Sequence, residues 1–140
     1  MPRTKARSFE HNQLGVTFFQ SGAVDLAIEQ FRRALKRAPW VPSYWLNLGI
    51  ALLDKGVLDE AQSALQRAIK LQPDSQSGYY HLAQLYKKLG NEQAVQSAYK
   101  KAIEINPHTY LAHRACEYLE DWHPRIIISS DANGCKDKGD

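Results

Sequence analysis

Apolar residues recur at steps of three and four along most of the chain, which is the spacing of one face of an α-helix. Two neighbouring segments, 44–55 and 58–71, show this spacing, and Gly56 separates them while Pro73 closes the second. Glycine ends a helix at low cost and proline cannot continue one, so the pattern predicts two helices joined by a tight turn. The apolar positions of the two segments are Trp45, Leu48, Leu52, Leu58, Ala61, Ala64, Leu65, Ala68 and Ile69.

The same two-helix pattern occurs three times, and no strand pattern appears before residue 125. Several columns of identical residues keep a spacing of 34 residues, which indicates an internal repeat. These columns are Pro39, Pro73 and Pro107; Gly22, Gly56 and Gly90; Ala34, Ala68 and Ala102; and Leu14, Leu48 and Leu82.

Small and large residues also alternate in phase with the repeat. Paired helices approach closely only where side chains are small, so we expect the small columns to face large residues of the partner helix. The small columns are Gly15, Gly49 and Ala83, and Ala27, Ala61 and Val95; the large columns are Phe18, Leu52 and Tyr86, and Phe31, Leu65 and Tyr99.

These residues resemble the tetratricopeptide repeat family, whose unit of about 34 residues follows W-x2-L-G-x2-Y, A-x3-F and P. The resemblance covers about residues 8–109 and implies an all-α, right-handed superhelix of three antiparallel helix pairs, at 8–41, 42–75 and 76–109. The second unit matches at Trp45, Leu48, Gly49, Leu52, Ala61, Leu65 and Pro73, the first at Leu14, Gly15, Phe18, Ala27, Phe31 and Pro39, and the third at Tyr79, Leu82, Tyr86, Val95, Tyr99 and Pro107.

A final helix is predicted over 109–122, with Thr109 as its N-cap. Glu117 stands there at the small-residue position, so no further helix is expected to pack on it, and the segment is predicted to cap a repeat domain of 8–123. Residues 1–7 are expected to form a basic arm. Residues 124–140 form a tail that we expect to be disordered in part, and its Ile126–Ile128 either packs on the cap, occupies a groove or pairs with a strand edge.

Composition and charge exclude several classes of protein. The chain of 140 residues is 44% hydrophobic and carries a net charge of +3, which Arg3, Lys5 and Arg7 account for. A neutral repeat domain argues against a nucleic-acid partner, and the lack of an apolar run of about 20 residues argues against a membrane protein. Two cysteines without a signal-peptide pattern predict free thiols and a cytoplasmic location.

Candidate catalytic chemistry is sparse, so we expect a non-enzymatic protein without cofactor or metal. His113 and Glu117 stand four residues apart on the predicted cap, near His108 and Cys116, but a helix start, an exposed acid and a buried thiol explain them better than a metal site. A Cys116–His113 nucleophile would lack an oxyanion stabiliser.

A basic run ends the second predicted helix. We interpret Arg32, Arg33, Lys36 and Arg37 as a solvated helix face favoured by the helix dipole, rather than a contact with phosphate or anionic lipid.

The resemblance implies a concave groove lined by the first helix of each pair. Its apolar stripe with two amides and basic residues toward the cap predicts a peptide-binding site for a protein partner. The predicted groove residues are Phe9, Asn12, Val16, Phe19, Leu46, Asn47, Ile50, Leu53, Tyr80, His81, Gln84, Lys87, Lys88, Arg114 and Tyr118. Tyr80 is expected to be the tyrosine of its helix that is free for recognition.

Some resembling domains hold the C-terminal carboxylate of heat-shock chaperones through a clamp of lysine, arginine and asparagine. Of the matching positions, only Asn47 fits that clamp. Asn12, Ser77 and His81 stand where it needs cations, and Val16 stands where it needs an asparagine, so this subfamily is rejected. An asparagine ladder fits poorly too, because its column reads Gln13, Asn47 and His81.

We therefore predict an adaptor or small chaperone-like protein that binds an apolar or amphipathic peptide. Two alternatives stay open at this point: a self-associating, homo-oligomeric scaffold, and a regulatory module of a multi-subunit enzyme.

Overall fold

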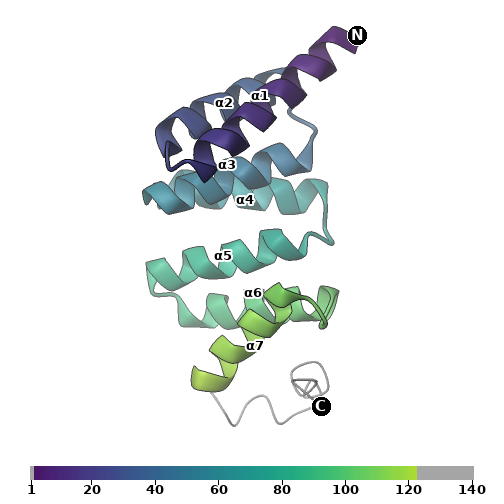
Figure 1. Cartoon of the computed structure of the whole chain (residues 1–140). Helices are drawn as coiled ribbons and strands as arrows, with labels where there is room; N and C mark the ends of the chain where they lie inside the picture. The colour runs from purple at the N-terminus through teal and green to yellow at the C-terminus, as the bar shows by residue number, and fades with distance from the viewer. Residues whose placement is uncertain (1, 123–140) are drawn as a thin grey trace. The chain divides into compact units, whose positions relative to one another are not determined.

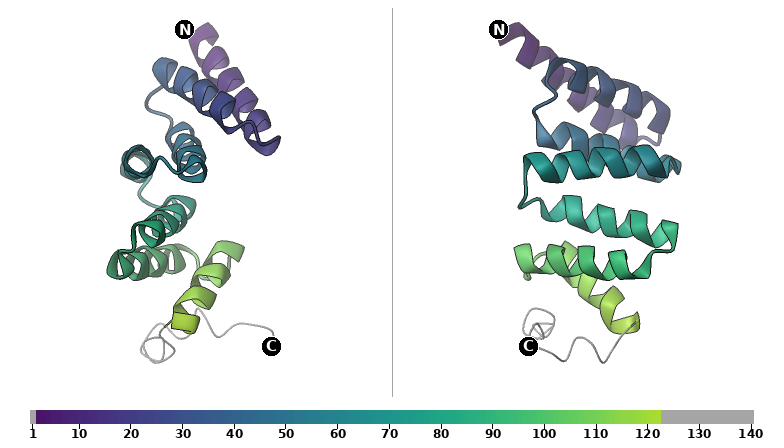
Figure 2. Two further views of the ribbon diagram at one scale, coloured as in Figure 1. Left: turned by 90° about the vertical axis from the view of Figure 1, so that its left-hand side faces the viewer. Right: turned by 180° about the vertical axis from the view of Figure 1, so that it is seen from behind.

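The computed structural model describes residues 2–122, which form seven α-helices, with side-chain burial described for 7–121. The chain divides into two compact units, unit 1 over Met1–Pro73 and unit 2 over Asp74–Asp140 (Figures 1 and 2). Unit 1 contains α1 (Pro2–Gln20), α2 (Val24–Arg37), α3 (Pro42–Lys55) and α4 (Leu58–Leu71), and unit 2 contains α5 (Gln76–Leu89), α6 (Glu92–Ile105) and α7 (Tyr110–Trp122).

Helix ends lie where the repeat pattern places them. Gly56 ends α3 in the left-handed conformation with φ of 90°, as predicted, and its backbone N–H donates to Leu52 and Leu53. The Asn91 side chain accepts a bond of 3.2 Å from the backbone N–H of Ala94 and caps α6. The Thr109 hydroxyl accepts one of 3.1 Å from Ala112 and caps α7, which confirms that prediction.

Close helix approach in unit 1 depends on the small columns. A Cβ added to Gly15 would lie 2.6 Å from the Phe31 ring, and one added to Gly49 would lie 2.7 Å from the Leu65 side chain. Phe31 and Leu65 are almost fully buried. The alternation of small and large residues is therefore confirmed between α1 and α2 and between α3 and α4, because no side chain fits at either glycine.

Unit 2 pairs α5 with α6, and α7 packs on both. Its core contains Ala83, Val95 and Tyr99 from the pair, and Ala112, Ala115, Cys116 and Leu119 from α7. Glu117 is exposed on the outer side of α7. This agrees with a capping helix whose outer face carries charge where the earlier pairs carry glycine or alanine.

Two features differ from the expectations. Residues 1–7 were predicted to form a basic arm. Helix α1 instead begins at Pro2, so that segment forms the first turns of a helix from residue 2 onward. Cys116 is disulfide-bonded, so the prediction of a free thiol is wrong there and the argument for a reducing compartment loses that support. The predicted tail, including Ile126–Ile128 and Cys135, lies outside the described residues.

Candidate functional site

The predicted groove residues of unit 1 lie on α1 and α3, and an amide pair joins the two helices. Asn47 Nδ2 donates a hydrogen bond of 2.9 Å to Asn12 Oδ1. Asn12 is buried and Asn47 is partly exposed. The pair holds the first helices of two successive repeats together through polar side chains.

Apolar side chains on the same two helices remain partly accessible. Val16 and Phe19 on α1 and Leu46 and Ile50 on α3 are each partly buried, while Phe9 is 54% exposed. Leu53 differs from the expectation, because it is 5% exposed and belongs to the core. The part of this surface open to a ligand is therefore narrower than the sequence pattern predicts.

Tyr80 in unit 2 is a core residue, contrary to the expectation that it is free for recognition. It is 7% exposed, and its ring centroid lies 5.6 Å from that of Tyr99 and 5.4 Å from that of His81. Tyr99 in turn lies 5.2 Å from Tyr118 on α7. These rings pack across three helices, and of the three tyrosines only Tyr118 is partly exposed.

His81 is partly buried on α5 and held by Ser77. Its Nδ1 lies 2.8 Å from the Ser77 carbonyl oxygen, which fits a neutral ring with Nδ1–H as the donor. Burial lowers the pKa of His81, and the Ser77 backbone bond opposes that shift in part. Burial, with smaller contributions from the nearby Tyr80 and Tyr118, raises the pKa of Tyr99 to about 12. Both groups are therefore uncharged near neutral pH.

Cations of α5 and α7 lie against aromatic rings. Lys87 Nζ is 4.4 Å from the Tyr118 ring centroid. Arg114 Nη1 donates a bond of 3.0 Å to the Tyr110 hydroxyl. Lys87, Lys88 and Arg114 are exposed and Gln84 is partly buried, so this surface of unit 2 offers donors to an anionic group.

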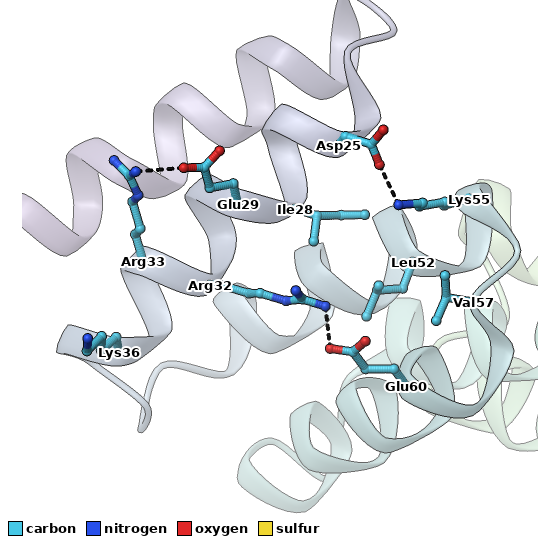
Figure 3. Close-up of a pocket in the computed structure, with 10 residues that line it drawn as sticks. All are labelled: Asp25, Ile28, Glu29, Arg32, Arg33, Lys36, Leu52, Lys55, Val57 and Glu60. Atoms are coloured by element: carbon cyan, nitrogen blue, oxygen red, sulfur yellow. Dashed lines mark hydrogen bonds and ion pairs between the residues drawn. The ribbon is translucent and has the colours of Figure 1, made fainter.

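A second feature of unit 1, which the sequence analysis missed, is a pocket of about 670 Å³ among α2, α3 and α4 (Figure 3). Its apolar floor contains Ile28, Leu52 and Val57. Two ion pairs of 2.6 Å, Asp25–Lys55 and Arg32–Glu60, connect α2 to the second repeat beside this floor. In the sequence, the only sign of this pocket is that oppositely charged residues stand about one repeat apart. Such a spacing does not show which charges pair in the fold.

No group of three or more metal-ligating side chains is brought together within residues that the structure describes. Of the four considered near the cap, Cys116 is fully buried and disulfide-bonded, whereas Glu117 is exposed. Within residues 2–122, no helix has the length and apolar character needed to cross a membrane.

Comparisons with known proteins agree with this architecture. Solved structures with the same fold include the TPR domain of Arabidopsis OM64, at a TM-score of 0.80 and 15% identity, covering 85% of this chain and 98% of that one. The first TPR domain of Spaghetti (RPAP3), bound to the HSP90 peptide SRMEEVD, matches at 0.78 and 17%, covering 84% and 94%. MamA matches at 0.77 and 25%, covering 92% of this chain and 74% of its own.

No curated protein sequence matches the chain. Two family models do match, both described as tetratricopeptide repeat, over residues 12–75 and 77–109. Their junction falls where the second repeat gives way to the third. Such repeats indicate a protein–protein interaction module. Together with the period of 34 residues and the close helix approaches at Gly15 and Gly49, these matches show that the chain belongs to the tetratricopeptide repeat family.

Proposed function

We propose that the chain is a non-enzymatic adaptor or small chaperone-like protein that binds an apolar or amphipathic peptide segment of a protein partner through those predicted groove residues that remain accessible. The observation that carries the proposal is the partly exposed apolar surface of α1 and α3, formed by Val16, Phe19, Leu46 and Ile50. Apolar residues left accessible beside polar ones are typical of an interaction site.

The amide pair supports this use of the surface. Asn12 and Asn47 are hydrogen-bonded to each other. Asn47 nevertheless remains partly exposed among apolar neighbours. An amide has two donors and an acceptor oxygen, so Asn47 keeps capacity for the backbone of a bound peptide. An amphipathic segment would bury its apolar side chains on Leu46 and Ile50 and bond its backbone at Asn47.

Unit 2, taken by itself, carries exposed cations that favour an acidic segment of a protein partner. Lys87 and Arg114 would each donate to a carboxylate, with the Tyr118 ring beside Lys87. The Spaghetti domain of the same fold holds an HSP90 peptide that contains adjacent glutamates. This chain has Asn12, Ser77 and His81 at the clamp's cation positions, so we do not assign it that chaperone partner.

The test is capture of partners from a cell lysate by wild type and by Ile50→Arg, read by mass spectrometry. A bound protein should be lost with Ile50→Arg by tenfold or more, about 1.4 kcal/mol, because a central apolar anchor is replaced by a charge. Leu26→Arg is the matched control, since Leu26 is 47% exposed on α2 and lies outside the proposed site. Both variants should keep the helix content of wild type.

Equal loss with Leu26→Arg, or unfolding by Ile50→Arg, would contradict the assignment of this surface. If wild type and Ile50→Arg recover only copies of the chain, the self-associating scaffold takes the place of this proposal; sedimentation at several concentrations would measure it. A cytoplasmic location belongs to the same proposal, and imaging of the tagged protein checks it.

A further inference from the structure

The antiparallel pairing of α1 and α2 brings cations of both helices to one end of unit 1. His11 Nδ1 lies 2.8 Å from Gln30 Oε1, which sets the register of the pair. Each helix rises about 1.5 Å per residue, so counting back from His11 and forward from Gln30 places Lys5 level with Lys36. Arg37 lies one step further along α2. Figure 1 shows the start of α1 and the end of α2 at the same edge of the unit.

Local helix chemistry explains only half of these charges. Lys36 and Arg37 stand in the last turn of α2, where the helix dipole favours cations. Arg3 and Lys5 stand near the start of α1, where the dipole opposes cations, and the first turn of α1 holds no acid. The cations of α1 are therefore placed against the preference of their own helix.

The neighbouring turn presents an exposed tryptophan. The backbone N–H of Val41 donates to the Ala38 carbonyl over 3.3 Å, which closes the turn, and Trp45 Nε1 donates to the Pro39 carbonyl over 2.7 Å. Trp40 stands at the tip and is 63% exposed. The corresponding tips one and two repeats later carry Asp74 and His108, so the repeat itself does not require an aromatic residue there.

Acidic residues neutralise only part of this end. Arg32 pairs with Glu60, and Arg33 with Glu29. Among the ion pairs within residues 7–121, none involves Lys36 or Arg37. The end of unit 1 therefore keeps positive charge around Trp40.

We propose that this end of unit 1, formed by the start of α1, the last turn of α2 and Trp40, binds the surface of an anionic lipid bilayer. Tryptophan is favoured at the level of the headgroups, where its ring meets apolar chains and its N–H meets water. Lysine and arginine beside it are attracted to the negative surface potential of such a bilayer. This binding goes beyond partner recognition on α1 and α3.

A bilayer fits this arrangement better than a nucleic acid does. The cations stand at the ends of two helices at one edge of the unit, and the exposed Trp40 follows the second of them, which suits contact with a broad surface. A single strand needs a basic groove that follows several nucleotides, with aromatic residues at intervals along it. The solvated-face interpretation of the α2 cations accounts for Lys36 and Arg37 alone and leaves both Trp40 and the cations of α1 unexplained.

The experiment is flotation of the full chain with vesicles of phosphatidylcholine alone or with added phosphatidylserine. We expect binding only to the anionic vesicles, weakened by salt because exposed charges are screened. Lys36→Gln/Arg37→Gln should lower the vesicle affinity about tenfold or more, given roughly fivefold for each cation near the surface. Trp40→Asp, which introduces the residue found at the second tip, should also lower it severalfold.

The matched control is Lys70→Gln/Lys100→Gln, which removes two exposed cations elsewhere, Lys70 being the counterpart of Lys36 one repeat later. This control should bind as wild type does, and circular dichroism should show all variants folded. Equal binding to neutral vesicles, equal loss in the control, or full binding by Trp40→Asp would overturn the proposal. Binding of single-stranded RNA but not vesicles, lost with the same variants, would replace it with a nucleic-acid contact.

Discussion

Asn47 on α3 donates a hydrogen bond of 2.9 Å to the side-chain oxygen of Asn12 on α1. The two residues stand 35 positions apart, one more than the repeat, so the bond links neighbouring first helices rather than equivalent positions. It lies among the partly exposed apolar residues of the proposed site. A change that breaks it therefore affects both the packing of α1 on α3 and the shape of that surface.

Replacement of one partner should cost more than replacement of both. Asn47→Ala leaves the Asn12 amide, which is 9% exposed, without its bond, and should lower the free energy of unfolding by about 1–3 kcal/mol. The double variant Asn12→Leu/Asn47→Leu should recover much of that loss. Urea denaturation of both variants measures the difference, and an equal cost for single and double changes would contradict a role for the bond itself.

Gly49→Ala should destabilise unit 1 although alanine favours helices. The added methyl would lie 2.7 Å from Leu65, so overpacking costs about 1–3 kcal/mol against a gain of about 1 kcal/mol in helix propensity. In a Leu65→Ala background the space is free, and the same change should raise the thermal midpoint. Calorimetry of the four variants tests this reversal of sign.

His81 should make stability depend on pH on the acidic side. Burial lowers its pKa below the ordinary 6.5, so the unfolded chain takes up the proton first and folding is weakened as the pH falls from 6.5 through the folded-state pKa. Above 6.5 this contribution does not change. His81→Gln should flatten that part of the profile, as measured by urea denaturation at several pH values; an unchanged slope would mean that other groups produce it.

The ion pairs beside the pocket in Figure 3 should contribute little to stability. Arg32 and Glu60 are 53% and 46% exposed at their side chains, and solvent screens such a pair. Glu60→Gln should lower the free energy of unfolding by less than about 1 kcal/mol, and the difference should shrink in high salt. A larger loss that salt does not reduce would show that the pair also holds α2 on the second repeat by packing.

Local patterns predicted most of the elements. Gly56 and Thr109 end or begin helices as expected, because a left-handed turn and a capping side chain depend on residues only a few positions apart. The beginning of α1 was predicted wrongly. Residues 1–7 carry charge without apolar spacing and were therefore expected to be an arm, but α1 begins at Pro2.

Candidate site residues were harder to predict, because helical spacing gives the direction of a side chain on its own helix and not what covers it. Leu53 and Ile50 both fall on the predicted groove side of α3, yet Leu53 is 5% exposed while Ile50 stays partly open. Tyr80 was expected to be free, but the rings of His81 and Tyr99 pack against it. The pocket of Figure 3 depends on residues from three helices.

The sequence by itself determined the repeat, its period, the helix pairs and the glycine contacts, because a period of 34 residues repeats the same short-range chemistry three times. Only the tertiary structure decided which apolar residues remain accessible, which cations share the end of unit 1 with Trp40, and which charges pair across the pocket. The physical reason is that burial and electrostatics depend on distances between helices, and a pattern along one helix does not contain those distances.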